Sequence, residues 1–331
     1  MLKEFYHLLT VRTYKNEMLR ILTIFIFIAL MFIAYKHLVE PEYKSNVEGF
    51  TQGSQYVLKN DQAIYDDFYV AVYDLLYRNE ERGMKELRYI IDSTHPSVNR
   101  SNILDLGCGT GYLVHMLSED GFVVHGIDKS NSMIDYCNEK YENQLSVLNE
   151  DAMNPLVFEP NSFSHVICTN FTIYEFEDKK QLFTNVNKWL KHNGYFIVHL
   201  VNPGDFDTTI PAAKPSIKMN PQEHTLARIT KTHINFDGFS YESNYVFENN
   251  VWEDQCDGGS KRPDIITMNE IFEDFETKKK RENEHKMFMV SLDEMERLAQ
   301  HCGFHLHSKA SQNNIYGGDK NQYIYVFEKI H

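Results

Sequence analysis

Residues 103–111 read Ile-Leu-Asp-Leu-Gly-Cys-Gly-Thr-Gly, and this stretch decides the fold. The apolar residues 102–106 predict a buried strand, and residues 112–119 predict a helix that begins directly after the glycines. Three glycines at alternating positions allow backbone angles that are closed to other residues, and they leave room for a ligand against the main chain. The start of the helix adds unpaired N–H groups at the same place. The stretch therefore predicts a strand, a tight turn and a helix that together bind a nucleotide-like cofactor.

The spacing of the glycines distinguishes between cofactors. A dinucleotide-binding turn reads G-x-G-x-x-G, whereas this one reads G-x-G-x-G, with Tyr112 in place of the third glycine. Asp105 lies inside the end of the strand, where a carboxylate would repel a pyrophosphate but could pair with an ammonium group. S-adenosylmethionine carries an ammonium and a sulfonium and no phosphate. Because Asp105, Gly107, Gly109 and Gly111 match the motif E/D-x-G-x-G-x-G position by position, the chain resembles the class I S-adenosylmethionine-dependent methyltransferases. A glycine-rich turn without a ligand is the alternative.

Asp128 is the second match to this family. It ends an apolar run over residues 122–127 and lies 17 residues after Gly111. An acidic side chain about 20 residues past a glycine turn, at the end of the next strand, binds ribose hydroxyls in α/β nucleotide sites. The resemblance implies this role for Asp128 and a packing contact with the adenosine for Met133. The alternative for Asp128 is a cap on the helix that begins near Ser130.

Two further segments match in order. The resemblance implies that Asp151, Ala152 and Met153, after a third apolar run, contact the adenine; a surface turn is the alternative. Asn170 ends the run 163–170, whose carboxyl end should face the transferred methyl group, because ligands of open α/β sheets bind outside these strand ends. Packing or capping is the alternative for Asn170. The candidate cofactor-binding residues are thus Asp105, Gly107, Gly109, Gly111, Asp128, Met133, Asp151, Ala152, Met153 and Asn170.

The order of the elements predicts an α/β fold. Strand-like runs alternate with helical segments over residues 61–331, which predicts a doubly wound sheet. By the family resemblance this sheet has seven strands, the last of them antiparallel. Residues 202–289 separate the fifth strand from a helix over 290–303, a far longer connection than usual. Hairpin signals around Asp237-Gly238 indicate an inserted antiparallel β cap there, as small-molecule enzymes of this class often carry.

Composition narrows the classes of partner. The 331 residues carry a net charge of −14 at pH 7, which disfavours nucleic acid as the methyl acceptor because phosphate backbones repel an acidic protein. Five cysteines without a C-x-x-C pair argue against a disulfide framework or a zinc site. Residues 237–276 hold eleven acidic side chains against Lys261 and Arg262. We therefore expect a small-molecule acceptor, with a cationic or amine acceptor as the sharper interpretation and a solvated acidic face as the alternative.

A membrane anchor is expected near the N-terminus. Residues 21–35 contain no charged side chain, and the apolar stretch extends over 19–39 if the flanking cations reach the membrane interfaces. A cleaved signal peptide or a buried helix is the alternative. This interpretation divides the chain into an N-terminal stub over 1–18, a transmembrane anchor over 19–39, a linker over 40–60 and a methyltransferase domain over 61–331.

The side of the membrane is ambiguous for such a single-pass protein. The basic residues before the span favour translocation of the domain. Two observations favour the cytosol instead: the cofactor is made there, and the glycosylation sequon at Asn170 falls on an expected wall of the active site. We lean slightly to a cytosolic domain.

Residues 61–77 repeat apolar and aromatic side chains at helical spacing. Such a helix before the glycine turn resembles the N-terminal lid of many small-molecule methyltransferases. Tyr65 and Tyr73 are candidates to close over the site, although an aromatic stripe that packs on the core gives the same pattern.

The expected chemistry is in-line methyl transfer, which depends mainly on holding the acceptor about 3 Å from the methyl carbon. A hydroxyl acceptor also needs a general base, and an amine acceptor needs deprotonation. His199, at the end of the fifth strand, is the first candidate, followed by His285 and Glu284 where the cap returns to the core. A histidine near a strand end is more often structural, and no spacing typical of metal ligands is present.

Two other classes of function stay open. The first is an NAD-dependent oxidoreductase on a Rossmann-like sheet, against which Asp105 and the missing third glycine count. The second is a catalytically inactive binding module that has kept the cofactor fold.

Overall fold

The computed structural model describes residues 21–31, 50, 53–247 and 264–330. The chain divides into two compact units, Met1–Asn46 and Val47–His331. In the first unit, the described residues are those of a helix over 21–31. The second unit holds the two sheets and the candidate site.

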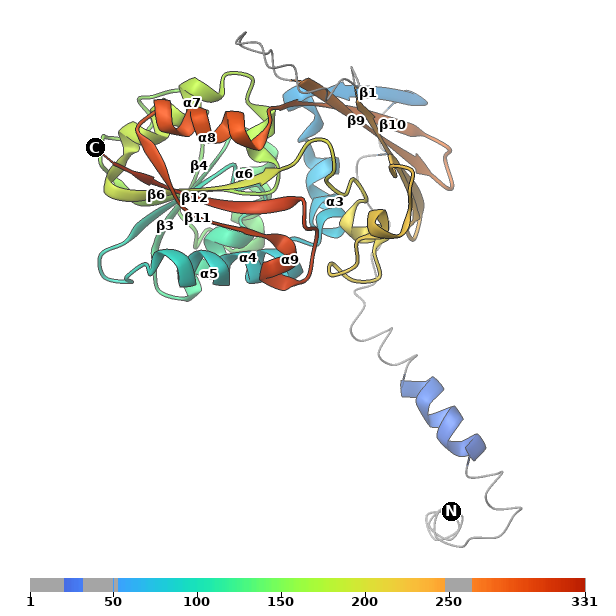
Figure 1. The fold of residues 1–331 in the computed structure, drawn as a ribbon. Coiled ribbons are helices and arrows are strands. Elements are labelled where there is room, and N and C mark those ends of the chain that lie inside the picture. The colour runs from blue at the N-terminus through green and yellow to red at the C-terminus, as the bar shows by residue number, and fades with distance from the viewer. Residues whose placement is uncertain (1–20, 32–49, 51–52, 248–263, 331) are drawn as a thin grey trace, which may run out of the picture. The chain divides into compact units, whose positions relative to one another are not determined.

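A seven-stranded sheet forms the centre of the second unit (Figure 1). Its strands lie in the order β11-β12-β6-β5-β2-β3-β4. The last strand, β12, pairs antiparallel with both neighbours, whereas the pairs from β6 to β4 are parallel. The expected seven strands with an antiparallel last strand are therefore confirmed. The strands are β2 (Asn102–Leu106), β3 (Val123–Asp128), β4 (Val147–Asn149), β5 (Phe163–Cys168), β6 (Leu190–Val201), β11 (Phe304–Ser311) and β12 (Gln322–Lys329).

Helices cover both faces of this sheet, with α7 and α8 on one face and α4, α5 and α9 on the other (Figure 1). Apolar side chains from both layers build the core; Phe183 of α7, for example, contacts Phe196 of β6 edge-on. Ser291 caps α8 by accepting the N–H of Glu294, as a Ser-x-x-Glu start favours. The helices are α4 (Asn79–Thr94), α5 (Tyr112–Glu119), α6 (Asn131–Lys140), α7 (Lys179–Trp189), α8 (Leu292–His301) and α9 (Gln312–Tyr316).

A second, five-stranded sheet, called here the cap sheet, has the strand order β1-β10-β9-β8-β7. Its strands β7 to β10 are antiparallel neighbours, as expected for the insertion, and two short 3-10 helices, η4 (Pro211–Ala213) and η5 (Pro221–His224), precede them. The fifth strand, β1, pairs parallel with β10 from the other end of the domain. The segment over 40–60 that was expected as a linker thus contains this strand at its end. The strands are β1 (Tyr56–Asn60), β7 (Lys231–Asn235), β8 (Phe239–Phe247), β9 (Asp264–Asp274) and β10 (Lys280–Met289).

The helical segment expected over 61–77 is broken into a 3-10 helix, η2 (Asp61–Ile64), and a helix, α3 (Asp67–Tyr77). Asp66 lies at the break, where its side chain accepts the N–H of Tyr69 and caps α3. Arg281 of β10 donates to both carboxylate oxygens of Asp66, at 2.7 and 2.8 Å. At the other end of α3, Asp74 accepts the hydroxyl of Thr110 at 2.8 Å. These contacts fasten α3 to the cap sheet and to the glycine turn.

The predicted membrane anchor is contradicted. None of the helices in the described ranges combines the length and the apolar character that a membrane crossing requires. Within the expected span, the described residues 21–31 are helical. Residues 19–20 and 32–39 of that span lie outside the described residues. The assignment as a single-pass membrane protein, with a membrane as partner, was therefore wrong. The prediction of which side of the membrane the domain faces is withdrawn with it.

Candidate functional site

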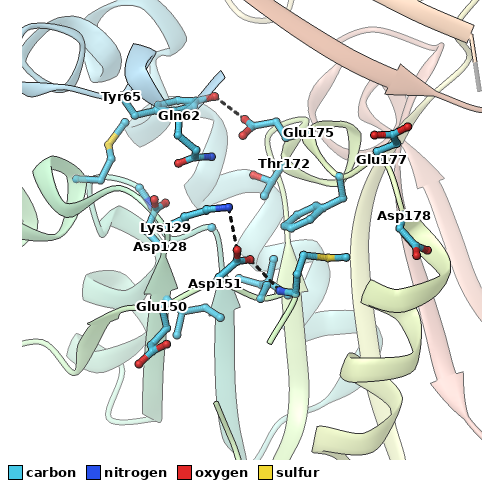
Figure 2. Close-up of a pocket in the computed structure, with 18 of the residues that line it drawn as sticks. Gln62, Tyr65, Asp128, Lys129, Glu150, Asp151, Thr172, Glu175, Glu177 and Asp178 are labelled. Carbon is cyan, nitrogen blue, oxygen red and sulfur yellow. Dashed lines mark hydrogen bonds and ion pairs between the residues drawn. The ribbon is translucent and has the colours of Figure 1, made fainter. Parts of the chain in front are cut away.

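A cavity of about 370 Å³ lies where the parallel strands β2 to β5 end (Figure 2). Each of these strands is followed by residues that line the cavity, because parallel strands bring their carboxyl ends to one edge of the sheet. Seven of the ten candidate cofactor-binding residues line it. They are Gly107, Gly109, Asp128, Met133, Asp151, Ala152 and Met153.

The three glycines of the turn all have positive φ, between +53° and +81°, which favours glycine. A Cβ at Gly107 would lie 2.5 Å from a methyl carbon of Thr172, and one at Gly111 would lie 2.2 Å from the sulfur of Cys137. A Cβ at Gly109, by contrast, would meet no atom closer than 3.9 Å. Gly107 and Gly111 thus permit close packing of the turn, and Gly109 leaves free space on the cavity side.

Asp128 links the turn to the end of β3. Its carboxylate accepts the N–H groups of Gly109 at 2.9 Å and of Ser130 at 2.8 Å. Burial raises the pKa of Asp128, and the two backbone donors act against this rise. Each carboxylate oxygen has a further lone pair, so Asp128 can still accept hydroxyl donors from the cavity that it lines.

Asp105 lies on the other side of the turn, in a smaller cavity of about 50 Å³ that Gly107, Gly109 and Asn170 also line. Its side chain is 3% exposed. Burial, with a smaller contribution from the charge of Asp128, raises the pKa of Asp105 to about 7. No hydrogen bond from the described residues reaches its carboxylate. A cationic group placed here would therefore stabilise the charged form.

Asp151, Ala152 and Met153 form a turn after β4 at the cavity (Figure 2). Asp151 accepts the N–H of Met153 at 2.9 Å and pairs with the ammonium of Lys129 at 2.8 Å. Although burial acts to raise the pKa of Asp151, these two partners hold it below its ordinary value. The backbone carbonyl of Ala152 accepts from Asn185 of α7, which fixes the turn on the core.

A second cavity of about 120 Å³ adjoins the first beneath the cap sheet. Four residues line both cavities, namely Gln62, Tyr65, Tyr73 and Glu175. Asn170 lines the second cavity, and its amide nitrogen donates to the hydroxyl of Tyr73 at 2.6 Å. A ligand in the second cavity would lie next to one in the first.

His285 of β10 lines this second cavity and is paired with a buried carboxylate. Its Nε2 lies 2.6 Å from Oε2 of Glu270, whose side chain is 0% exposed. Glu270 also accepts the hydroxyl of Tyr241 at 2.8 Å and the amide of Asn283 at 3.2 Å. Burial acts to raise the pKa of Glu270, but His285 and these donors lower it on balance. A charged carboxylate only accepts, so Nε2 carries the hydrogen and Nδ1 is the basic atom of the ring.

The other two candidate bases do not lie in the site. His199 is 1% exposed, lines none of the cavities described above, and its ring packs edge-on against Phe171. Burial, together with the charge of Arg82, lowers the pKa of His199 to about 3, so it is a poor proton acceptor. Glu284 precedes His285 on β10, so strand alternation turns it to the opposite face, where it pairs with Lys286 at 3.7 Å. The structure thus disfavours His199 and Glu284 as bases.

Sequence reasoning missed two carboxylates of this region. Glu175 follows β5 in a 3-10 helix, η3 (Thr172–Glu175), and accepts the hydroxyl of Tyr65 at 2.5 Å (Figure 2). Its place five residues after Asn170, at the end of a strand that faces the site, was a usable signal. Glu270 lies inside a long acidic segment, where no local pattern sets it apart from its neighbours.

The chain is similar in sequence to known methyltransferases. Residues 103–194 match a family described as the methyltransferase domain. The cypemycin N-terminal methyltransferase of Streptomyces sp is 27% identical over 150 residues, which cover 44% of this chain and 60% of that protein. Matches to two further curated relatives cover 25% and 14% of those proteins. The chain thus spans less than two thirds of the length of these curated relatives.

Two solved structures share the fold. The CcbJ methyltransferase of Streptomyces caelestis aligns with 82% of this chain and 100% of its own, with a TM-score of 0.61 and 16% identity. A sugar N-methyltransferase of Streptoalloteichus sp aligns with 78% of this chain and 93% of its own, with a TM-score of 0.53 and 15% identity. At 15–16% sequence identity, the similarity to these two structures shows a shared fold and nothing more.

Proposed function

Since the chain carries a class I S-adenosylmethionine-dependent methyltransferase domain, we propose that it transfers the methyl group of S-adenosylmethionine to a small-molecule amine or hydroxyl. The cofactor lies in the 370 Å³ cavity and the acceptor in the adjoining 120 Å³ cavity. The observation that carries this proposal is the contact between the two cavities, because the methyl carbon and its acceptor must meet.

The residues of the first cavity fit this cofactor. Asp128 has lone pairs left for the ribose hydroxyls, and Gly109 leaves the backbone open beside it. Asp105 is a buried carboxylate that lacks a donor among the described residues, which suits the ammonium of the cofactor. Asp151, Ala152 and Met153 are proposed to contact the adenine. Asn170 and Gly111 act indirectly, through the contacts with Tyr73 and Cys137.

When bound, S-adenosylmethionine supplies an electrophilic methyl group. The protein holds the acceptor in line with it and receives the proton that the acceptor releases. We assign the proton to Nδ1 of His285, which Glu270 keeps as the basic atom of the ring. Proton uptake gives the ring of His285 a positive charge. This charge pairs with the buried carboxylate of Glu270, which would otherwise have no positive partner in this pair, and the pairing favours protonation of His285.

Two measurements on the full chain test the proposed function. Titration calorimetry with adenosylhomocysteine should show one site per chain. Incubation with methyl-labelled cofactor and a small-molecule extract should then label a compound of low mass. Binding without any labelled product would favour an inactive binding module, and preferential binding of NAD would favour the oxidoreductase.

A variant pair tests the assignment of the base. His285→Asn should lower kcat by about 10²-fold or more, the usual contribution of a general base, with the affinity for adenosylhomocysteine within twofold of the wild type. His233→Asn, on the exposed part of β7, serves as the matched control and should leave both values unchanged. Equal kcat values for the two variants would exclude His285 as the base.

A further inference from the structure

Glu175 occupies the junction of the two cavities. It lines both of them, and its side chain is exposed at the end of η3. Burial, with a smaller contribution from the charge of Asp128, raises the pKa of Glu175 on balance, although the hydrogen bond from Tyr65 and the charge of His285 act to lower it. Tyr65 donates to one oxygen, Oε1, so Glu175 keeps acceptor positions for a ligand at this junction.

Aromatic rings surround the rest of the second cavity. Four tyrosines and two phenylalanines line it: Tyr65, Tyr73, Tyr77, Tyr245, Phe171 and Phe288. Contacts between rings hold part of this group in place, since Tyr73 lies 5.9 Å from Tyr69 and 4.8 Å from Tyr77 between ring centroids. Aromatic faces attract cations within about 6 Å, and a ring of them is the usual way to bind an ammonium group.

The basic side chains among the described residues that line this cavity are His285 and Lys286, and each of them pairs with a carboxylate other than Glu175. Lys286 lines the cavity, but its ammonium pairs with Glu284 at 3.7 Å, and the side chain of Lys286 is 46% exposed. Asp61, which also lines the cavity, adds a second carboxylate. A neutral hydroxyl acceptor would bring no positive charge to the carboxylates of Glu175 and Asp61, whereas an ammonium ion would.

From these observations we propose that the acceptor is an aliphatic amine, which enters as an ammonium ion and is held by the carboxylate of Glu175 inside the tyrosine-rich cavity. This rests on the proposed function and names its substrate class. A carboxylate and a set of aromatic faces together select a cation, whereas neither is needed for an alcohol.

The reaction balances with the groups present. The ammonium R–NH₃⁺ gives one proton to Nδ1 of His285 and becomes R–NH₂. The nitrogen lone pair then forms a bond to the methyl carbon while the carbon–sulfur bond breaks and the sulfur keeps the electron pair. The products are R–NH₂CH₃⁺, adenosylhomocysteine and the proton on His285, which is released to water.

The test uses two probes of equal shape and different charge, choline and its carbon isostere 3,3-dimethylbutan-1-ol, on the full chain saturated with adenosylhomocysteine. Calorimetry or competition should show choline binding at least about tenfold tighter, a difference of about 1.4 kcal/mol. Glu175→Gln should remove this preference and leave the affinity for the alcohol unchanged. Glu282→Gln, on the same cap sheet but bonded to Tyr56, is the matched control and should keep the preference.

The outcomes separate the two proposals. No binding of adenosylhomocysteine by the wild type would overturn the proposed function itself. Binding of adenosylhomocysteine with equal affinities for the two probes, or with no uptake of choline at millimolar concentration, would overturn the amine assignment alone. A preference that survives in Glu175→Gln would likewise refute the role of Glu175.

Discussion

At the scale of single residues, two carboxyl groups beside the glycine turn differ in their partners. Asp128 accepts two backbone donors, whereas Asp105 accepts none from the described residues. Burial raises the pKa of both, and that of Asp105 reaches about 7. A buried carboxyl without donors is stable when protonated, or when charged beside a cation. We therefore expect the ammonium of the cofactor to draw Asp105 into its charged form.

This difference predicts a pH-dependent stability for the ligand-free protein. The folded state holds the proton of Asp105 more tightly than the unfolded chain, so the stabilisation is full below pH 3.8 and is lost as the pH rises through about 7. Asp105→Asn stays neutral at every pH. At pH 8 it should be more stable than the wild type by up to about 4 kcal/mol, and at pH 5 by much less.

Thermal unfolding at the two pH values checks this, and calorimetry should show weaker binding of adenosylhomocysteine by the same variant. A stability difference that does not change with pH would contradict the raised pKa of Asp105.

Asp128 carries a second prediction at this scale. Asp128→Ala should reduce the affinity for adenosylhomocysteine by about 1–3 kcal/mol, because hydrogen-bond partners of the ribose and of the Gly109 N–H are lost together. Calorimetry measures the change. Asp92→Ala, whose side chain is 72% exposed on α4, is the control. An unchanged affinity in Asp128→Ala would rule out the ribose contact.

At the scale of elements, β10 connects the cap sheet to the site. Alternate residues of this strand face the domain: Arg281 binds Asp66 before α3, Asn283 binds Glu270, and His285 lines the second cavity. Glu282 and Glu284, which alternate with them, point the other way, as strand geometry requires. One strand thus supplies both the attachment of α3 and the proposed base.

Arg281 is the residue of β10 on which this attachment depends most. Its guanidinium is buried, donates to Asp66, to the Ile64 carbonyl and to Asn283, and stacks on Phe68 at 4.8 Å. Arg281→Met should cost about 2–4 kcal/mol of unfolding free energy, since it leaves buried acceptors without donors. Chemical denaturation measures this value. Arg88→Met, with a side chain that is 86% exposed, should change it by less than about 0.5 kcal/mol.

Hydrogen exchange gives a second readout for Arg281→Met. Amide protection should fall first in α3, whose N-terminus Arg281 holds. Uniform loss of protection over the whole domain would indicate a general destabilisation and not a detached helix.

At the scale of the whole molecule, the unit Val47–His331 contains both sheets and every residue of the candidate site. A chain shortened to residues 47–331 should therefore keep its thermal midpoint and bind adenosylhomocysteine within twofold of the full chain. Differential scanning calorimetry and titration calorimetry check the two values. A tenfold loss of affinity would mean that residues 1–46 contribute to the site.

The sequence by itself determined the glycine turn, the order of strands and helices, the cofactor class and most of the first cavity. These depend on short-range patterns: φ preferences of glycine, apolar periodicity and the acidic residues Asp105, Asp128 and Asp151 at or near the ends of β2, β3 and β4. Membrane crossing was inferred from an apolar run alone. That inference was wrong, because no helix among the described residues is both long enough and apolar enough to cross a membrane.

Only the tertiary structure decided the acceptor side. Asp66 and Arg281 meet across 215 positions of sequence, and Tyr69 lies near His285 across 216. Strand register and packing between such distant segments determine which side chains face a cavity. A local sequence pattern predicts neither the register nor the packing. For this reason His199 and His285 look alike in the sequence, whereas in the fold His199 is enclosed in the core and His285 is paired with Glu270 at the second cavity.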